Sequence, residues 1–451
     1  MNNPLANWWR SQKFNEAVKS QNNRLAKQLL KEIQNSGAKL SWQQKLFKER
    51  LQLEKLLQQK NDRIKEGDRR LEELEVQLGF GQLDDSLARI DRLTLFPDTK
   101  FIEYIKNAFN MTECDASMIQ CTGIDEKVFN EFEKHLAGFI KNELNNLSRQ
   151  KTNVDSLLEQ AIDDIQKLKE GQDPQYSFEL SPHVYLMRYF LDNVYCTYLA
   201  WFFIYKAGLL PTKVNILDIA AGPGTVGYGL ALLLQSSRDF FSMSPMHISY
   251  YSLEQQKAFQ YRGLQFWRQY MEPQGMNAYF RFDTSSIFDS DNQSQRLPKK
   301  FFDFIVISHC FFNDEERREK SLLIYKDIFT NSLNDSGYAL LIIQEKKLLI
   351  PYKVRRVDDC QQELSVVQQF VDELGLNLVW YKYLHSTNSR TSYPNFGKFA
   401  RENLPVQKFI SPLFRQHFKL PYDLNYTLDD YVISCGASKL NTETGRMPVP
   451  Q

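Results

Sequence analysis

The fold is decided by the stretch Asn215-Ile216-Leu217-Asp218-Ile219-Ala220-Ala221-Gly222-Pro223-Gly224-Thr225. Its apolar run predicts a strand over 214–219, and the small residues after it predict a tight loop with a helix beginning after Gly224. Small residues let the backbone come within contact distance of a ligand, and the free N–H groups of a helix start favour a polar or anionic group. The stretch therefore predicts a ligand site in which Asp218 lies at the carboxyl end of its strand.

The flanking residues repeat this alternation of strand and helix. We expect further strands over 248–253, 279–282, 304–308, 338–344, 376–384 and 431–435, and helices over 185–207, 256–271, 314–333 and 358–374. Strands that alternate with helices of crossover length predict an α/β fold with a doubly wound, mostly parallel sheet. A long insertion rich in aromatic and basic residues, at about 386–428, separates the last two strands.

The first 175 residues have a different composition and predict an all-helical N-terminal domain that precedes the sheet. Leucine and isoleucine recur at heptad spacing from Leu46 to Leu78, with interruptions at Arg50, Lys60 and Gly67, which favours a helical hairpin or an interrupted coiled coil. The linker candidate is Gly-Gln-Asp-Pro at 171–174, because glycine and proline both end helices. We therefore expect two domains, 1–175 and 176–451.

Charge and cysteine content narrow the class of protein. Lys and Arg number 56 against 55 Asp and Glu, so the net charge of +1 gives no global attraction to polyanions. The first 50 residues carry ten basic and three acidic residues, as an organelle transit segment or a solvated amphipathic helix would. Six cysteines without a Cys-x-x-Cys pair indicate neither a disulfide framework nor a metal centre, and we expect a cytoplasmic protein.

No membrane span is expected either. The longest uncharged apolar run, 194–205, would rise only about 18 Å as a helix against a hydrocarbon slab of about 30 Å. We expect it to be a buried helix.

The ligand-site stretch resembles motif I of the class I S-adenosylmethionine-dependent methyltransferases, whose pattern is an acid followed by x-Gly-x-Gly-x-Gly. The resemblance covers about residues 212–345. Gly222 and Gly224 match the later glycines, whereas Ala220 stands where the first is usual, which we expect to require a negative φ there. The resemblance implies that S-adenosyl-L-methionine is the cofactor and methyl transfer the reaction.

The resemblance also implies a set of cofactor contacts. Asp218 would lie near the amino group of the methionine part, and Glu254 would accept hydrogen bonds from both ribose hydroxyls, as the two oxygens of a carboxylate can. The remaining implied cofactor contacts are Ala220, Ala221, Gly222, Gly224 and Thr225 in the loop, Asp283 and Thr284 at the adenine, Ser308 at the methyl group, and Arg188 at the cofactor carboxylate.

Methyl transfer asks for alignment more than for reactive side chains, and alignment alone contributes about 7–11 kcal/mol. A base is needed only if the acceptor arrives protonated. His309, just past the strand expected at 304–308, is the candidate base. The alternative is a histidine that is hydrogen-bonded in the crevice without a catalytic role. Cys310 is more consistent with a small buried thiol than with a nucleophile.

Two alternatives to an active methyltransferase stay open. Residues 222–227 also satisfy Gly-x-Gly-x-x-Gly, the dinucleotide fingerprint, although Glu254 follows Gly224 by 30 residues rather than about 20. The run Leu-Asp-x-x-Ala-Gly-Pro-Gly-Thr after a tyrosine-rich helix is similar to methyltransferase-fold assembly factors of the small ribosomal subunit. That similarity implies a non-catalytic assembly or scaffold protein that still binds the cofactor. The methyl acceptor, a small molecule, protein or RNA, is not identified by the sequence, and the helical N-terminal domain suits a protein partner or a homo-oligomer.

Overall fold

The computed structural model describes residues 4–19, 22–37, 44, 94–150, 153–167, 174–240, 246–275, 278–288, 297–354, 360–390, 394–419 and 421–437. The chain divides into two compact units, Met1–Ile90 and Asp91–Gln451. The predicted heptad segment, 46–78, lies outside the described residues.

The first unit contains two helices that pack on each other, α1 (Pro4–Lys19) and α2 (Asn23–Asn35). The side chain of Asn22 accepts a hydrogen bond from the backbone N–H of Leu25 and so caps the start of α2. Both helices contribute to a small apolar core, which consists of Phe14, Ala17, Ala26, Leu29, Leu30 and Ile33.

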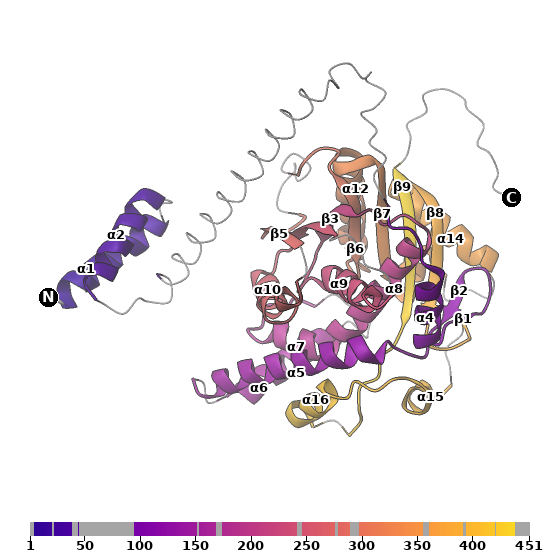
Figure 1. Cartoon of the computed structure of the whole chain (residues 1–451), viewed down its shortest axis with the longest axis horizontal. Helices are drawn as coiled ribbons and strands as arrows, with labels where there is room; N and C mark the ends of the chain where they lie inside the picture. Colours follow the sequence, from indigo (N-terminus) through magenta and orange to yellow (C-terminus); the bar gives the residue numbers. More distant parts are fainter. Residues whose placement is uncertain are drawn as a thin grey trace, which may run out of the picture. The chain divides into compact units, whose positions relative to one another are not determined.

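The second unit is built around one sheet (Figure 1). Its strands are β1 (Thr112–Glu113), β2 (Met118–Gln120), β3 (Lys213–Ile219), β4 (His247–Leu253), β5 (Ala278–Asp283), β6 (Phe302–Ser308), β7 (Leu333–Gln344), β8 (Leu376–His385) and β9 (Asp429–Ala437). In the described part of the chain their order is β1-β2-β8-β9-β7-β6-β3-β4-β5. From β7 to β5 neighbouring strands are parallel, whereas β9 runs antiparallel to β7 and to β8. The predicted fold class, a doubly wound and mostly parallel sheet, is confirmed.

Helices cover both faces of this sheet. They are α4 (Thr99–Ala108), α5 (Glu126–Ser148), α6 (Val154–Gln166), α7 (Ser181–Arg188), α8 (Phe190–Lys206), α9 (Thr225–Ser237), α10 (Lys257–Tyr270), α12 (Glu315–Ser332), α13 (Glu345–Leu349), α14 (Cys360–Glu373), α15 (Phe396–Asn403) and α16 (Ile410–Phe418), with 3-10 helices at Glu272–Gln274 and Ile350–Tyr352. Alternate residues of each central strand join different cores. Ile216 and Phe304 pack with α8 and α9, while Leu217 and Ile305 pack with α12 and α14.

The helix predicted over 185–207 is two helices, because Tyr189 leaves helical geometry between α7 and α8. The predicted apolar run lies in α8, where it is buried in the core as expected. Within the described ranges, no helix combines the length and the apolarity that crossing a membrane requires.

The chain does not divide at the boundary expected near residue 175. Helices α5 and α6 contact α7 and α16, and α5 also contacts α9 and α10, so residues from Asp91 onward belong to the same unit as the sheet. Nor is this region entirely helical, because β2 extends the sheet as a parallel neighbour of β8. The sequence pattern missed β2 because three residues are too few to show the alternation of a strand.

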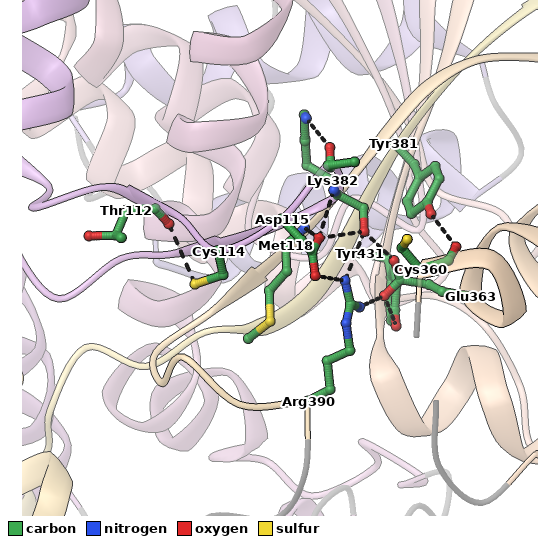
Figure 2. Close-up of polar contacts among 12 residues, drawn as sticks. Thr112, Cys114, Asp115, Met118, Cys360, Glu363, Tyr381, Lys382, Arg390 and Tyr431 are labelled. Carbon is green, nitrogen blue, oxygen red and sulfur yellow. Dashed lines mark hydrogen bonds and ion pairs between the residues drawn. The ribbon is translucent and has the colours of Figure 1, made fainter. Parts of the chain in front are cut away.

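A group of polar residues fixes β2 to the sheet edge, and we call it the arginine-centred cluster: Asp115, Ser117, Glu363, Arg390 and Tyr431. Figure 2 shows Asp115, Glu363 and Tyr431 around Arg390. Arg390 forms ion pairs with Asp115, at 2.6 Å, and with Glu363, which is fully buried. Ser117 donates to Glu363, and Tyr431 on β9 donates to it at 2.9 Å. Segments far apart in the sequence are thus joined by one guanidinium.

The predicted insertion, 386–428, folds back onto the helices that precede the sheet. The buried carboxylate of Glu133 on α5 accepts hydrogen bonds from the backbone N–H groups of Phe409 and Ile410 at the start of α16, at 2.7 and 2.9 Å. Its basic side chains are largely paired: Lys408 with Glu126 and Arg390 in the arginine-centred cluster. The Glu133 hydrogen bonds and the Lys408–Glu126 pair join the insertion to α5.

Candidate functional site

The carboxyl end of β3 holds a buried carboxyl group. Asp218 is 1% exposed, and its Oδ2 accepts a hydrogen bond from the hydroxyl of Tyr250 on the neighbouring strand β4. Its Oδ1 has no hydrogen-bond partner among the described residues. Burial and then the nearby charge of Glu254 raise the pKa of Asp218 to about 8, against the lowering effect of the Tyr250 hydroxyl. Oδ1 of Asp218 is therefore a buried acceptor whose hydrogen bonding is not satisfied by the described residues.

Glu254 lies one residue past β4 and meets the loop after β3. Its two oxygens accept hydrogen bonds from the backbone N–H groups of Gly222, at 2.8 Å, and Gln256, at 2.7 Å. Burial raises its pKa, although these backbone donors act in the opposite direction. Each carboxylate oxygen has a second lone pair, so Glu254 keeps capacity to accept further hydrogen bonds.

The loop between β3 and α9 is tightly wound. Positive φ angles occur at Ala220 (55°), Gly222 (54°) and Gly224 (89°), and Gly224 is the N-cap of α9. The expectation of a negative φ at Ala220 is wrong: the residue adopts the left-handed conformation, where its Cβ crowds the backbone. The loop geometry that glycine ordinarily supplies is thus kept despite the methyl group.

Neighbouring elements approach this loop so closely that only glycine fits. A Cβ on Gly263 of α10 would lie 2.0 Å from the carbonyl oxygen of Pro223, and one on Gly229 would lie 2.3 Å from Thr197 Oγ1. The same threonine hydroxyl donates to the carbonyl of Thr225 at 3.0 Å. The first turn of α9 is therefore held from two sides, which leaves the loop little freedom to move.

The carboxyl end of β5 is tied to that of β4. The backbone N–H of Glu254 donates to the carbonyl of Asp283 at 3.1 Å, and Thr284 Oγ1 donates to Gln260 Oε1 at 2.8 Å. The amide nitrogen of the buried Gln260 donates in turn to Ser252 and to the Asp283 carbonyl. Gln260 thus holds the ends of two strands in register.

Aromatic side chains lie over the same crevice. The rings of Tyr176 and Tyr185 both contact the ring of Phe259 edge-on, with centroids 5.4 Å apart. Burial raises the pKa values of both tyrosines, and the nearby charge of Glu254 adds a smaller increase. The guanidinium of Arg188 lies 4.9 Å from the ring centroid of Tyr189. Among the described residues no ion pair of Arg188 occurs.

A second group of polar residues surrounds His309, which follows β6 with a positive φ of 58°. Its Nδ1 lies 2.9 Å from Ser308 Oγ, and its Nε2 lies 3.0 Å from Oδ1 of Asp430 on β9. The thiol of Cys196 on α8 is within reach of the same two groups, since one ligand atom from each of the three residues lies within 4.8 Å of the others. Both nitrogens of the imidazole are therefore engaged by neighbours.

The structure brings most of the predicted residues together at the carboxyl ends of the strands. Asp218, Glu254 and the loop 220–225 form one crevice, and Asp283 and Thr284 join it through Gln260. Cys310 has a different partner, because the hydroxyl of Tyr325 donates to its carbonyl oxygen at 2.9 Å and lies 3.5 Å from its Sγ. A small cavity adjoins the loop, and it is lined by Gly222, Pro223, Gly224, Tyr250, Ser252 and Gln260, among others.

Sequence reasoning missed four residues of this site. Tyr250 and Gln260 belong to predicted elements, yet nothing in their spacing showed that they face Asp218 and Asp283. Cys196 and Asp430 lie 113 residues before and 121 residues after His309, so no local motif could join them. The only available signal was the acidic pair Asp429-Asp430 at the start of β9.

The comparisons with known proteins concern the fold. Among solved structures, the chain is similar to an S-adenosyl-L-methionine-dependent methyltransferase from Methanococcus maripaludis, at 13% identity over 56% of this chain and 90% of that one, with a TM-score of 0.27. It is similar to a methyltransferase from Methanosarcina mazei, at 13% identity over 51% of this chain and 95% of that one, with a TM-score of 0.29.

A third similar structure is fibrillarin in its complex with Nop5p, at 11% identity over 51% of this chain and 75% of that chain, with a TM-score of 0.27. No protein-family model and no curated protein matches the sequence. At these values the similarities carry no argument about activity, which has to rest on the geometry of the site.

Proposed function

We propose that this protein is an S-adenosylmethionine-dependent methyltransferase. The observation that carries the proposal is the buried Oδ1 of Asp218, which has no hydrogen-bond donor among the described residues and lies near a second buried carboxyl, Glu254. In the described region neither carboxyl forms an ion pair. Such a pair fits a ligand that brings both positive charge and N–H or O–H donors, as the ammonium, sulfonium and ribose groups of this cofactor do.

Each part of the crevice has a role in this proposal. Asp218 would accept from the cofactor amino group, Glu254 from the ribose hydroxyls, and the backbone at Asp283 and Thr284 would border the adenine. The loop 220–225 would come against the ligand without side chains in the way, as the positive φ values at Gly222 and Gly224 permit. Arg188, which lacks an ion pair in the described ranges, would be available to the cofactor carboxylate.

Bound cofactor supplies an activated methyl group, and the chain has only to align the acceptor and exclude water. We assign the role of base to His309, for acceptors that arrive protonated. With Nε2–H donating to Asp430, the imidazole would take the proton at Nδ1, where Ser308 now lies. Asp430 would then be a positioning residue that also stabilises the imidazolium.

Isothermal titration calorimetry with S-adenosylmethionine tests the cofactor assignment. The wild type should bind, and Glu254→Ala and Asp218→Asn should each lose about 10–100-fold in affinity, because each removes a hydrogen bond to a charged group. A matched control is Asp303→Asn, which alters a buried carboxyl at the amino end of β6 and should leave the affinity unchanged. Absence of binding to the wild type, or equal binding by all four proteins, would contradict the proposal. Preferential binding of NAD would instead favour the dinucleotide alternative.

Turnover separates an enzyme from a protein that only binds the cofactor. Incubation with methyl-labelled cofactor and fractionated small molecules, RNA and protein should label one fraction. His309→Gln should then lower the rate of labelling by about 10²–10⁴-fold while cofactor affinity is unchanged. A His309→Gln protein with full turnover would remove its assignment as base.

We further propose that the N-terminal unit, Met1–Ile90, recognises a partner and that the protein works in the cytoplasm. Six cysteines that form no disulfide are consistent with a reducing compartment. Light scattering of the full chain and of a version lacking residues 1–90 tests the first point. The proposal would be contradicted if the two versions had the same number of chains per particle and labelled the acceptor at the same rate.

A further inference from the structure

Three side chains from distant parts of the sequence meet beside β6, and one of them, the Cys196 thiol, has no role in the methyl-transfer proposal. They are Cys196 from α8, His309 after β6 and Asp430 from β9. Cys196 is fully buried, and Asp430 is 7% exposed. A thiol, an imidazole and a carboxylate are the three commonest side-chain ligands of zinc-like metals.

We propose that Cys196, His309 and Asp430 form a binding site for one divalent transition-metal ion, of the class represented by Zn²⁺. This inference does not rest on the proposed function, because it concerns ligand chemistry and not the cofactor crevice.

The distances suit such an ion. The separation of 3.0 Å between His309 Nε2 and Asp430 Oδ1 is close to the edge of about 3.3 Å that two oxygen or nitrogen ligands form around tetrahedral Zn²⁺. Cys196 Sγ lies within 4.8 Å of a ring nitrogen of His309 and of a carboxylate oxygen of Asp430, so a small side-chain movement brings it to the same ion. Cys196 lies on α8 and Asp430 on β9, and both elements are packed in the core, which keeps these two ligands near their positions.

The charges of the site also suit a divalent ion. A thiolate and a carboxylate together carry two negative charges, which an ion of charge +2 neutralises. The resulting neutral complex of ion and ligands costs far less free energy to bury than the separate charges would. No lysine or arginine forms an ion pair with Asp430 in the part of the chain that the structure describes. The alternative to a metal is that Asp430 accepts only from His309 and from the Cys196 thiol, to which it is hydrogen-bonded.

Surrounding groups orient the ligands as the outer partners of metal sites do. His309 Nδ1 lies 2.9 Å from Ser308 Oγ, which leaves Nε2, the nitrogen that faces Asp430, to bind an ion. The backbone N–H of His309 donates to the carbonyl of Ile342 at 2.8 Å and holds its unusual φ. The backbone N–H of Asp429 is 3.3 Å from Asp430 Oδ2, the oxygen that does not face His309.

Three protein ligands leave a fourth position for water or another ligand. The two oxygens of Asp192 accept from Gln407, at 2.9 Å, and Thr427, at 3.2 Å, which holds that carboxylate to other partners. An imidazole whose Nε2 holds a metal cannot take up a proton at Nδ1, so a bound metal and a histidine base exclude each other. Metal occupancy would therefore suppress any reaction that uses His309 as base.

Titration of the metal-free full-length chain with Co²⁺ tests the proposal, because Co²⁺ replaces Zn²⁺ at such sites and gives thiolate-to-metal charge-transfer absorption in the near ultraviolet. We expect that band to saturate at one equivalent and to disappear when one equivalent of Zn²⁺ is added. Cys196→Ala should lack the band, and Asp430→Asn should weaken binding at least tenfold.

Cys435→Ala is the matched control, because Cys435 is equally buried and lies on the same strand as Asp430. It should behave as the wild type. Circular dichroism of each variant shows whether it is folded, and cofactor titration shows whether the crevice is intact. Absence of a charge-transfer band in the folded wild type, or an undiminished band in folded Cys196→Ala, would overturn the proposal. Failure of cofactor binding alone would leave this result standing and would contradict only the proposed function.

Discussion

Two regions of this protein each hold a pair of carboxyl groups, and the partners of the two pairs differ. In the arginine-centred cluster, Asp115 and Glu363 share the guanidinium of Arg390. In the crevice, Asp218 and Glu254 have only a tyrosine hydroxyl and backbone N–H groups, and no cation among the described residues. The carboxyl groups of the first region are paired within the chain, whereas in the second an oxygen of Asp218 has no donor in the part of the chain that the structure describes.

The protonation of the two regions differs accordingly. Burial opposes ionisation in both, but the backbone N–H of Met118 and the charge of Arg390 hold the pKa of Asp115 at about 2, while the pKa of Asp218 rises to about 8. A carboxylate with a cation partner inside the chain is compatible with a stable fold. A buried carboxylate without one costs folding free energy, and such groups are common where a ligand supplies the missing partner. The comparison separates a cluster whose charges are paired within the chain from the crevice that we propose as a binding site, and the following changes test it.

The largest effect is expected from Arg390→Ala. Removal of the guanidinium leaves Glu363 buried without a counter-charge, which should lower the free energy of unfolding by about 3–5 kcal/mol. Denaturant unfolding measures this effect. Arg415→Ala is the matched control in the same insertion, because its pair with Asp423 is about half exposed and should contribute no more than about 1 kcal/mol. Equal losses in the two variants would show that the arginine-centred cluster is not what fixes β2.

The next largest effect concerns pH. Because folding raises the pKa of Asp218 from 3.8 to about 8, the folded state binds its proton more tightly than the unfolded state. The contribution of this group to stability is therefore complete below about pH 4 and is lost as pH rises toward 8, with a slope of about 1.4 kcal/mol per unit. The ligand-free wild type should lose about 3 kcal/mol relative to Asp218→Asn between pH 5 and pH 7. Parallel stability curves for the two proteins would contradict the assignment.

A smaller effect is expected from Tyr250→Phe, which removes the only donor to Asp218 in the described chain. Loss of one hydrogen bond should lower the free energy of unfolding by about 1–2 kcal/mol. At a pH where Asp218 is ionised, it should also lower the affinity for S-adenosylmethionine by about tenfold. Thermal unfolding and calorimetry measure these two quantities. Tyr251→Phe, on the opposite face of the same strand, is the control and should change neither.

The smallest effect concerns the loop. Ala220→Gly removes a Cβ from a residue with φ of 55°, which should stabilise the protein by about 0.5–1 kcal/mol after the extra entropy of glycine in the unfolded chain is counted. Ala221→Gly should instead destabilise it by about 0.5–1 kcal/mol, because Ala221 has no positive φ. If both substitutions destabilise equally, the left-handed conformation of Ala220 is not strained.

The strands and helices of the sheet were predictable because their signals are local. The apolar run before Asp218 and the small residues after it define β3, the loop and the start of α9 without reference to any other part of the chain. The same is true of β4, β5, β6 and their acidic or polar ends. Prediction was wrong where the deciding contact is remote. The φ of Ala220 depends on neighbours that hold the loop, and the three residues of β2 become a strand only beside β8.

The amino-acid sequence by itself determined the order of elements and the positions of Asp218, Glu254 and His309 at strand ends, because hydrophobic periodicity and chain direction suffice for both. Only the tertiary structure decided that Tyr250 bonds Asp218, that Arg390 closes the sheet edge, and that Cys196 and Asp430 meet His309. These contacts join side chains 32 to more than 200 residues apart. Such pairs form because packing brings distant elements together, and no pattern within one element encodes which polar groups will meet.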